Sequence, residues 1–296
     1  MDSRERATYA GLLFVLTIAV VILTCTGPAQ RGGGKMGSSG TPTQTEIAAA
    51  TAYAREIGSA AVLVLKDGAS AYEFGDLTKK YMCHSIRKPF LGALYGIYVE
   101  RGVIDMSSTL AELEVDDIAP SLTSREKGAT IRDLLLSRSG VYHEAAGEAP
   151  SMVAARPERG SHEPGAFFYY NNWDFNALGT VFGELTGESI FVAFDREIAR
   201  KIGMVDFTPA DCTYVYERAR SDHPAYFFRM STREMGRFGL LMQNLGRWEG
   251  REIVPESWIR ESTTVYPVSN PGGDPYGYLW RIIPKEAGLG HGFYHT

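Results

Sequence analysis

The sequence predicts an α+β fold, on three observations. Residues 60–65 and 69–74 read as two strands around the turn Lys66-Asp67-Gly68. Strand-like residues return near the end of the chain, at 276–283. The chain between them has mainly helical periodicity. We therefore expect an antiparallel sheet formed by the chain ends, with an all-α subdomain inserted between them.

Composition limits what the chain can be. Its 296 residues are 44% hydrophobic and 22% charged, which suits a globular protein with a sizeable core. A net charge of -5, with no basic run, gives no reason to expect a nucleic-acid partner. Three cysteines, Cys25, Cys83 and Cys212, are too few for a disulfide framework, and no paired Cys or His spacing indicates a metal. We expect neither metal nor cofactor.

The first 27 residues are predicted to be a membrane anchor or signal segment. Residues 7–30 carry no charge, and the apolar run 11–23 approaches the length of a bilayer span. We favour an uncleaved single-pass anchor. The alternative is cleavage, because Gly27-Pro28-Ala29 offers a small-residue site and residues 22–25 resemble a lipoprotein box. The Gly/Ser-rich residues 28–45 read as a flexible linker, which leaves 46–296 as the folded domain.

Apolar periodicity predicts the helices of this domain. The segment 90–99 is apolar or small almost all round, so it should form a buried helix, with Pro89 in its first turn and Gly102 at its end. The other predicted helices cover residues 46–57, 130–136, 173–185, 190–202 and 232–245.

Ser85 and Lys88 lie at the N-terminus of the predicted buried helix. Residues three apart on a helix lie on one face, so the lysine can take the proton of the serine hydroxyl. The helix N-terminus favours the negative charge that develops there. S-x-x-K is the arrangement of penicillin-recognising serine enzymes. Ser85 is therefore a candidate nucleophile; the alternative is an ordinary helix-capping serine.

A second S-x-x-K, at Ser124 and Lys127, has the same spacing. It lies in a polar segment with no apolar helix behind it, so we interpret it as solvated surface.

A tyrosine and an asparagine near residue 170 complete a set of motifs. Two pairs overlap there: Tyr169 with Asn171, and Tyr170 with Asn172. With Ser85 and Lys88, they make the domain similar to the serine β-lactamase and penicillin-binding-protein superfamily. The relevant branch holds class C β-lactamases, D-Ala-D-Ala carboxypeptidases, esterases and 6-aminohexanoate-oligomer hydrolases. In the family, the tyrosine lies at a fixed distance after a Pro-Gly pair, and the asparagine lies at a fixed distance before a Leu-Gly pair. Here Pro-Gly is at 164–165 and Leu-Gly at 178–179, and these distances select Tyr170 and Asn172. Scaffold signatures of the family match at residues 131–140, 203–204, 230–232 and 246–250.

The resemblance implies a β-lactamase/transpeptidase-like fold and an acyl-transfer site. Ser85 would attack a carbonyl, and Lys88 and Tyr170 would share the removal of its proton, with the choice of base left open. Asn172 would hydrogen-bond Lys88 or the substrate amide. Asn172 also has a structural alternative, as the cap of the helix that opens at Trp173.

The third motif of the family is reached only at the chain's end. His295 and Thr296 resemble the start of a His-Thr-Gly strand, which would line the substrate site. We expect the closing C-terminal strands to be missing, the reading frame to be truncated, and the 296-residue chain alone not to turn over an ester.

The sequence thus predicts an envelope-located serine hydrolase that cleaves an amide or ester of a small molecule or peptide. The location would be the cell membrane with an extracytoplasmic domain, or secreted if the segment is cleaved. The alternative is an inactive membrane-tethered scaffold that binds cell-wall peptides. Phe167 to Tyr170, with Trp173 behind them, would suit a hydrophobic acyl group or belong to the core.

Overall fold

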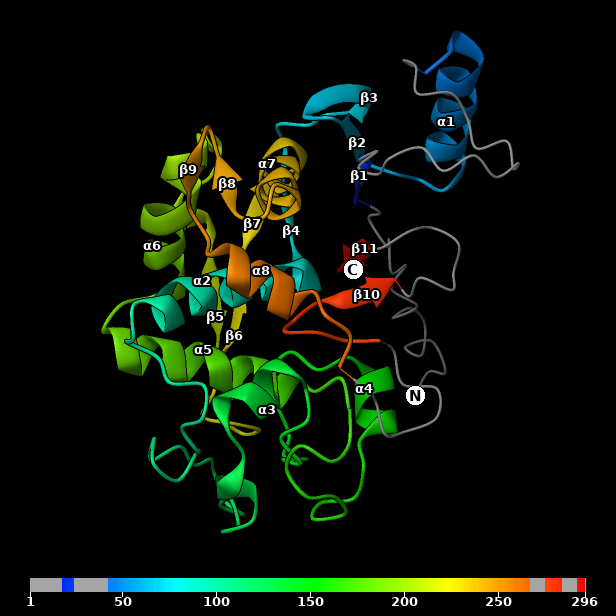
Figure 1. The fold of residues 1–296 in the computed structure, drawn as a ribbon. Coiled ribbons are helices and arrows are strands. Elements are labelled where there is room, and N and C mark those ends of the chain that lie inside the picture. The colour runs from blue at the N-terminus through cyan, green and yellow to red at the C-terminus, as the bar shows by residue number, and fades with distance from the viewer. Residues whose placement is uncertain (1–17, 24–41, 267–274, 284–291, 296) are drawn as a thin grey trace, which may run out of the picture. The chain divides into compact units, whose positions relative to one another are not determined.

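The computed structural model describes residues 18–23, 42–266, 275–283 and 292–295 (Figure 1). The chain divides into two compact units, Met1–Lys79 and Lys80–Thr296. All predicted site residues belong to the second unit. Thr296 lies outside the described residues.

The first unit contains a three-stranded sheet in the order β1 (Ile18–Leu23), β2 (Ala61–Lys66) and β3 (Ala69–Gly75). The predicted hairpin is confirmed: β2 and β3 are antiparallel, and Asp67 and Gly68 both have positive φ, as a tight hairpin turn requires. β1 lies parallel to β2. The rest of the predicted anchor lies outside the described residues.

Helix α1 (Gln44–Glu56) belongs to the same unit and contacts β3. Its start is fixed by a capping box, in which the Thr43 side chain accepts from the Glu46 amide while Glu46 reaches back to the Thr43 amide. The helix expected at 46–57 is thereby confirmed.

Within the described ranges, no single helix combines the length and the apolar composition needed to cross a membrane. α5 (Asn172–Thr186) and Ile190–Ile202 meet both criteria only as a pair bent by 76°.

Helix α2 (Arg87–Glu100) is the central element of the second unit, where it contacts α5, α6 and α8. Its residues from Arg87 to Tyr98 are all buried, which confirms the predicted all-round burial. Pro89 lies in the first turn. The remaining helices are α3 (Ile131–Leu135), α4 (Pro150–Ala155), α6 (Ile190–Phe194), α7 (Thr232–Gln243) and α8 (Glu256–Ser262).

The helix expected at 190–202 is interrupted. After α6 the backbone passes through a π-helical turn, Asp195–Ala199, and a 3₁₀ turn, Arg200–Ile202. It ends at Gly203, whose φ of 69° is left-handed.

Aromatic side chains join α2 to its neighbours. The Phe90 ring lies 5.2 Å from Phe194 of α6, 5.2 Å from Phe228 and 4.8 Å from Phe238 of α7, measured between centroids. Tilted and edge-on contacts at these distances are favourable beyond the area they bury. They fix the position of the helix whose first turn carries Lys88.

The described strands of the second unit form four antiparallel pairs: β4 (Lys80–Met82) with β7 (Arg229–Ser231), β5 (Thr213–Val215) with β6 (Ala225–Phe227), β8 (Arg247–Trp248) with β9 (Arg251–Glu252), and β10 (Arg281–Ile283) with β11 (Gly292–Tyr294). Helices with small antiparallel sheets confirm the α+β class. Near the end of this unit, β10 pairs with β11.

Candidate active site

Ser85 lies on a 3₁₀ turn, His84–Ile86, between β4 and α2. The Cys83 amide donates to the Phe228 carbonyl at 2.9 Å, which ties the turn to the strand region beside it. His84 then takes a left-handed φ of 41°, and the chain turns into the helix. Ser85 is half-buried. Neither the 3₁₀ turn nor α2 has a side-chain cap, so the helix-capping alternative for Ser85 is wrong.

Lys88 is buried completely and lies beside the serine. Its Nζ is 2.8 Å from Ser85 Oγ, and 4.5 Å from the ring centroid of Phe175 on α5. It makes no ion pair with a carboxylate in the part of the chain that the structure describes. Burial, followed by the charges of Arg87 and Arg281, lowers the pKa of Lys88 well below its usual range. A neutral amine at this distance can accept the Ser85 proton.

Tyr170 also lies beside the lysine. Lys88 Nζ is 4.8 Å from the Tyr170 ring centroid, and the guanidinium carbon of Arg281 is 5.0 Å from it. The phenol oxygen is buried and makes no hydrogen bond of good geometry within the described ranges. Burial raises the pKa of Tyr170, while the Ser85 hydroxyl and the charges of Arg87 and Arg281 oppose the rise. At neutral pH the phenol keeps its proton, which suits a donor better than a base.

The structure separates the two overlapping tyrosine–asparagine pairs. The Tyr169 hydroxyl donates to the Met152 carbonyl at 2.7 Å and is engaged away from the serine, whereas Tyr170 is beside it. Asn171 is the N-cap of α5, because its side chain accepts from the Trp173 amide at 3.1 Å. The predicted cap role of Asn172 is therefore wrong by one residue.

Asn172 is the first residue of α5 and is buried. Its amide nitrogen donates to the Gly147 carbonyl at 2.8 Å. This atom does not hydrogen-bond Lys88, so that expectation needs correction. The reason is that the first turn of α5 directs the side chain toward the loop containing Gly147.

His295, after β11, reaches the site. Its ring centroid is 6.1 Å from that of Tyr170. Ser85 and Lys88, Tyr170, and His295 thus come together from three separate stretches of the chain.

Sequence reasoning missed Arg87. Its side chain is only 3% exposed, and its guanidinium lies 4.8 Å from the Tyr226 ring centroid and 4.6 Å from that of Phe227. The available signal was a second cation directly before Lys88, in the first turn of a helix predicted to be buried.

The aromatic run before α5 belongs mostly to the core. Phe168, Tyr169 and Trp173 are buried, and the Trp173 indole donates to Asp117 at 2.7 Å. Phe167 stacks on His162 with 4.0 Å between centroids. The core alternative is therefore the better one for these rings, and only Tyr170 of the run contributes to the site.

The two cysteines of the described chain are free thiols. Cys83, two residues before the serine, is buried, and burial raises its pKa far above the usual range. Burial also raises the pKa of Cys212, to about 11. Among the residues that the structure describes, no three His, Cys, Asp or Glu side chains gather as metal ligands would.

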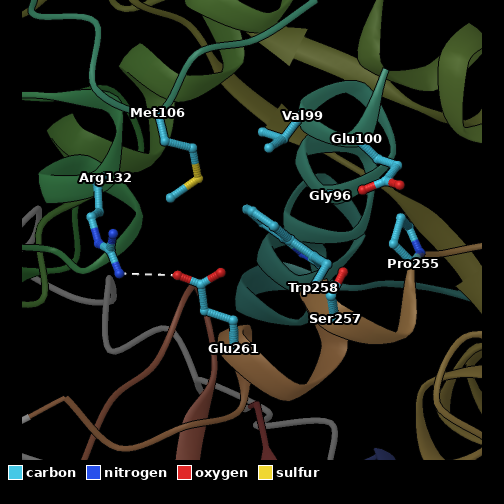
Figure 2. Close-up of a pocket in the computed structure, with 9 residues that line it drawn as sticks. All are labelled: Gly96, Val99, Glu100, Met106, Arg132, Pro255, Ser257, Trp258 and Glu261. Atoms are coloured by element: carbon cyan, nitrogen blue, oxygen red, sulfur yellow. Dashed lines mark hydrogen bonds and ion pairs between the residues drawn. The ribbon is translucent and has the colours of Figure 1, made fainter. Parts of the chain in front are cut away.

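A pocket of about 220 Å³ opens at the other end of α2 (Figure 2). Trp258 of α8 lies across it, and an ion pair of 3.0 Å between Arg132 and Glu261 borders it. Ser85, Lys88 and Tyr170 do not line this pocket.

The sequence model of the Beta-lactamase family matches residues 45–296. The chain belongs to this family, whose members include serine hydrolases of the penicillin-binding type. No protein of curated function matches the sequence.

Solved structures agree on the fold. A protein assigned as a β-lactamase from Bacteroides dorei DSM 17855 matches with a TM-score of 0.61 and 18% identity, over 82% of this chain and 81% of that one. A D-stereospecific amidohydrolase from Streptomyces sp. matches at 0.54 and 17% identity, over 76% and 77%. A protein assigned as a 6-aminohexanoate-dimer hydrolase from Bacillus anthracis matches at 0.54 and 22% identity, over 72% and 62%. The chain spans only 57% and 59% of two further matched structures.

Proposed function

We propose that this protein is a serine hydrolase that cleaves an amide or ester through an acyl-enzyme, with Ser85 as nucleophile and Lys88 as its base. The observation that carries the proposal is the 2.8 Å contact between Lys88 Nζ and Ser85 Oγ, made by an amine whose pKa burial lowers well below its usual range. A serine hydroxyl becomes a useful nucleophile when such a base removes its proton.

The proposed reaction proceeds in two halves. Ser85 Oγ attacks the substrate carbonyl carbon while its proton passes to Lys88, and the carbonyl electron pair moves to oxygen. The tetrahedral intermediate then collapses, the bond to the leaving group breaks, and Tyr170 donates a proton to that group. The proton on Lys88 can replace the one that Tyr170 gave, because both side chains adjoin Ser85. Water hydrolyses the acyl-enzyme to release the acid.

The substrate class is also a proposal. Two structural neighbours carry names of enzymes that act on amides, and the residues assigned here suit the same bond. Asn172, His295 and Thr296 are proposed to contact the substrate. The first 27 residues are proposed to hold the domain at the cell envelope.

The test is intact-protein and peptide mass spectrometry after incubation with a fluorophosphonate and, separately, with a penicillin. A covalent label needs one attack and no turnover, so it tests Ser85 directly. We expect one adduct, located on Ser85 and absent from Ser85→Ala. Ser124→Ala, in the exposed second S-x-x-K, is the matched control and should label like the unaltered protein.

The outcomes separate the candidates. Labelling by penicillin as well as fluorophosphonate indicates substrates related to cell-wall D-peptides. A folded protein that stays unlabelled by both reagents contradicts the hydrolase proposal and favours the non-catalytic scaffold.

A further inference from the structure

In the part of the chain that the structure describes, Arg87 is a buried cation with no carboxylate partner. Its Nε and Nη2 are shielded from solvent and have no hydrogen-bond partner within the described ranges, and no ion pair to it is found there. A buried charge normally requires an oppositely charged partner. Arg87 is instead held between two aromatic rings, Tyr226 and Phe227.

This form of burial leaves the positive charge uncancelled. An aromatic face attracts a guanidinium through its quadrupole and carries no net charge. A carboxylate partner could also stabilise the arginine, but it would neutralise the field of the guanidinium. The field of Arg87 therefore acts on its neighbours in a region of low dielectric, where charges interact strongly.

The nearest consequence is for Lys88, the next residue. We propose that Arg87 is a positioning residue that keeps the buried Lys88 amine in the neutral form that can accept a proton from Ser85. The inference rests on the proposed function, in which Lys88 is the base. Arg87 acts through Lys88 and need not touch the substrate.

The surroundings of Lys88 favour this assignment. Burial opposes a charge on Lys88, and Arg87 is the first of the charged groups that add to this effect, with Arg281 second. No carboxylate in the described chain acts in the opposite direction on Lys88. The groups that face the Arg87–Lys88 pair are His84 and Ser85 from the 3₁₀ turn, Tyr170 and Phe175 from α5 and the segment before it, Tyr226 and Phe227 from β6, and Arg281 from β10.

The first experiment measures the rate of Ser85 labelling by the fluorophosphonate between pH 5 and 10. In Arg87→Met the loss of the charge should raise the pKa of Lys88, so the acid limb of the profile moves to higher pH. A shift of one pH unit makes labelling about tenfold slower at pH values on the acid limb, where the rate follows the fraction of neutral Lys88. Arg87→Lys keeps the charge and should restore the limb. Arg229→Met, which removes an exposed arginine of β7, is the control and should not move it.

A purely structural role for Arg87 gives a different result. Labelling would then fall by the same factor at every pH, and the acid limb of Arg87→Met would stay where it is in the unaltered protein. That outcome overturns the inference. If Arg87→Met does not fold, Arg87→Gln serves the same comparison.

A second experiment does not depend on activity. Unfolding free energy is measured against pH for Arg87→Met, Lys88→Met and the double variant. The unfolded chain protonates Lys88 below pH about 10.5 and the native chain does not, so stability should rise with pH toward that value. Arg87→Met should reduce the rise only where Lys88 is present. Equal slopes with and without Lys88 would contradict the inference, even in a protein that no reagent labels.

Discussion

At the scale of single residues, the site depends on a lysine placed where charge is unfavourable. Lys88 is buried among Phe175, Tyr170 and two arginines, so its protonated form is disfavoured by both desolvation and repulsion. This placement lowers the stability of the fold and makes the amine available as a base.

Lys88→Met should therefore improve stability while abolishing reactivity. We expect Ser85 labelling to fall by about 10²–10⁴, the usual contribution of a general base. The variant should be more stable at pH 7, by about 1–4 kcal/mol, because an ionisable group no longer has to be buried. The gain should shrink as pH approaches the unfolded pKa of lysine, since the native and unfolded chains then differ less in bound protons. Chemical denaturation at pH 7 and 10 measures both values; an equal gain at the two pH values would contradict a lowered pKa.

Tyr170→Phe should affect amides more than activated esters. A phenolate leaving group departs without a proton, whereas an amine requires one, and Tyr170 is the protonated group beside Ser85. We expect acylation by a p-nitroanilide to fall about 10²-fold and acylation by a p-nitrophenyl ester to fall much less. First-turnover release of the two chromophores gives the ratio. A uniform loss for both substrates would assign Tyr170 to the base instead.

Local spacing in the sequence was enough to predict that Ser85 and Lys88 lie together. It was not enough to predict the side chains that pack around them. Ser85 and Lys88 are adjacent because a helical turn forces residues three apart together. Phe175 meets Lys88, and the rings of Tyr226 and Phe227 meet Arg87, only after separate elements pack on α2. No local pattern encodes that packing. The choice between Asn171 and Asn172 as cap needed the backbone itself, since neighbouring asparagines have equal capping preference.

At the scale of elements, α2 is also closely packed near its far end. A Cβ added to Gly96 would lie 2.3 Å from the Trp258 ring of α8. Figure 2 shows the tryptophan lying across this part of α2. The contact leaves no room for any side chain.

Gly96→Ala should consequently separate α2 from α8. We expect a loss of about 1–3 kcal/mol, the usual cost of overpacking a core. Thermal unfolding measures it, with Gly128→Ala as the matched control because nothing lies within 4 Å of its added Cβ. Trp258→Leu in the same chain should recover part of the loss; equal melting temperatures for the two alanine variants would show that the helices adjust freely.

Element prediction succeeded where periodicity was strong. The β2–β3 hairpin and the helices α2, α5 and α7 lie within a few residues of their expected bounds. The short pairs β4–β7 and β5–β6 were not predicted, because three-residue strands that pair across long stretches of sequence leave no periodic signal.

At the scale of the whole molecule, ion pairs connect elements that are distant in sequence. Glu197, in the π-helical turn, pairs with Arg101 at the end of α2 at 2.6 Å and with Lys201 at 2.9 Å. The hydrogen bond from Arg101 is the main cause that lowers the pKa of Glu197. The pKa of Asp116 is likewise lowered, to about 2, mainly by a hydrogen bond from Lys127. Such carboxylates stabilise the native chain only while they are ionised.

The protein should accordingly lose stability as pH falls from about 5 toward 2. A carboxylate with a lowered native pKa contributes fully above its unfolded pKa, about 4.3 for glutamate, and less as pH falls through the native value. Glu197→Gln should cost about 1–2 kcal/mol at pH 7 and flatten this decline. Urea unfolding at several pH values measures it. The exposed Glu249→Gln is the control, expected within about 0.5 kcal/mol; an unchanged pH slope in Glu197→Gln would contradict the assignment.

The buried thiol of Cys83 and the half-buried thiol of Cys212 have a practical consequence for handling the protein. Oxidation and alkylation of cysteine proceed through the thiolate, and Cys83 and Cys212 are kept protonated by burial. The thiol two residues from Ser85 is therefore expected to react slowly with iodoacetamide and mild peroxide at neutral pH. We therefore expect an electrophile captured in this turn to be attached to the serine rather than to its neighbouring sulfur.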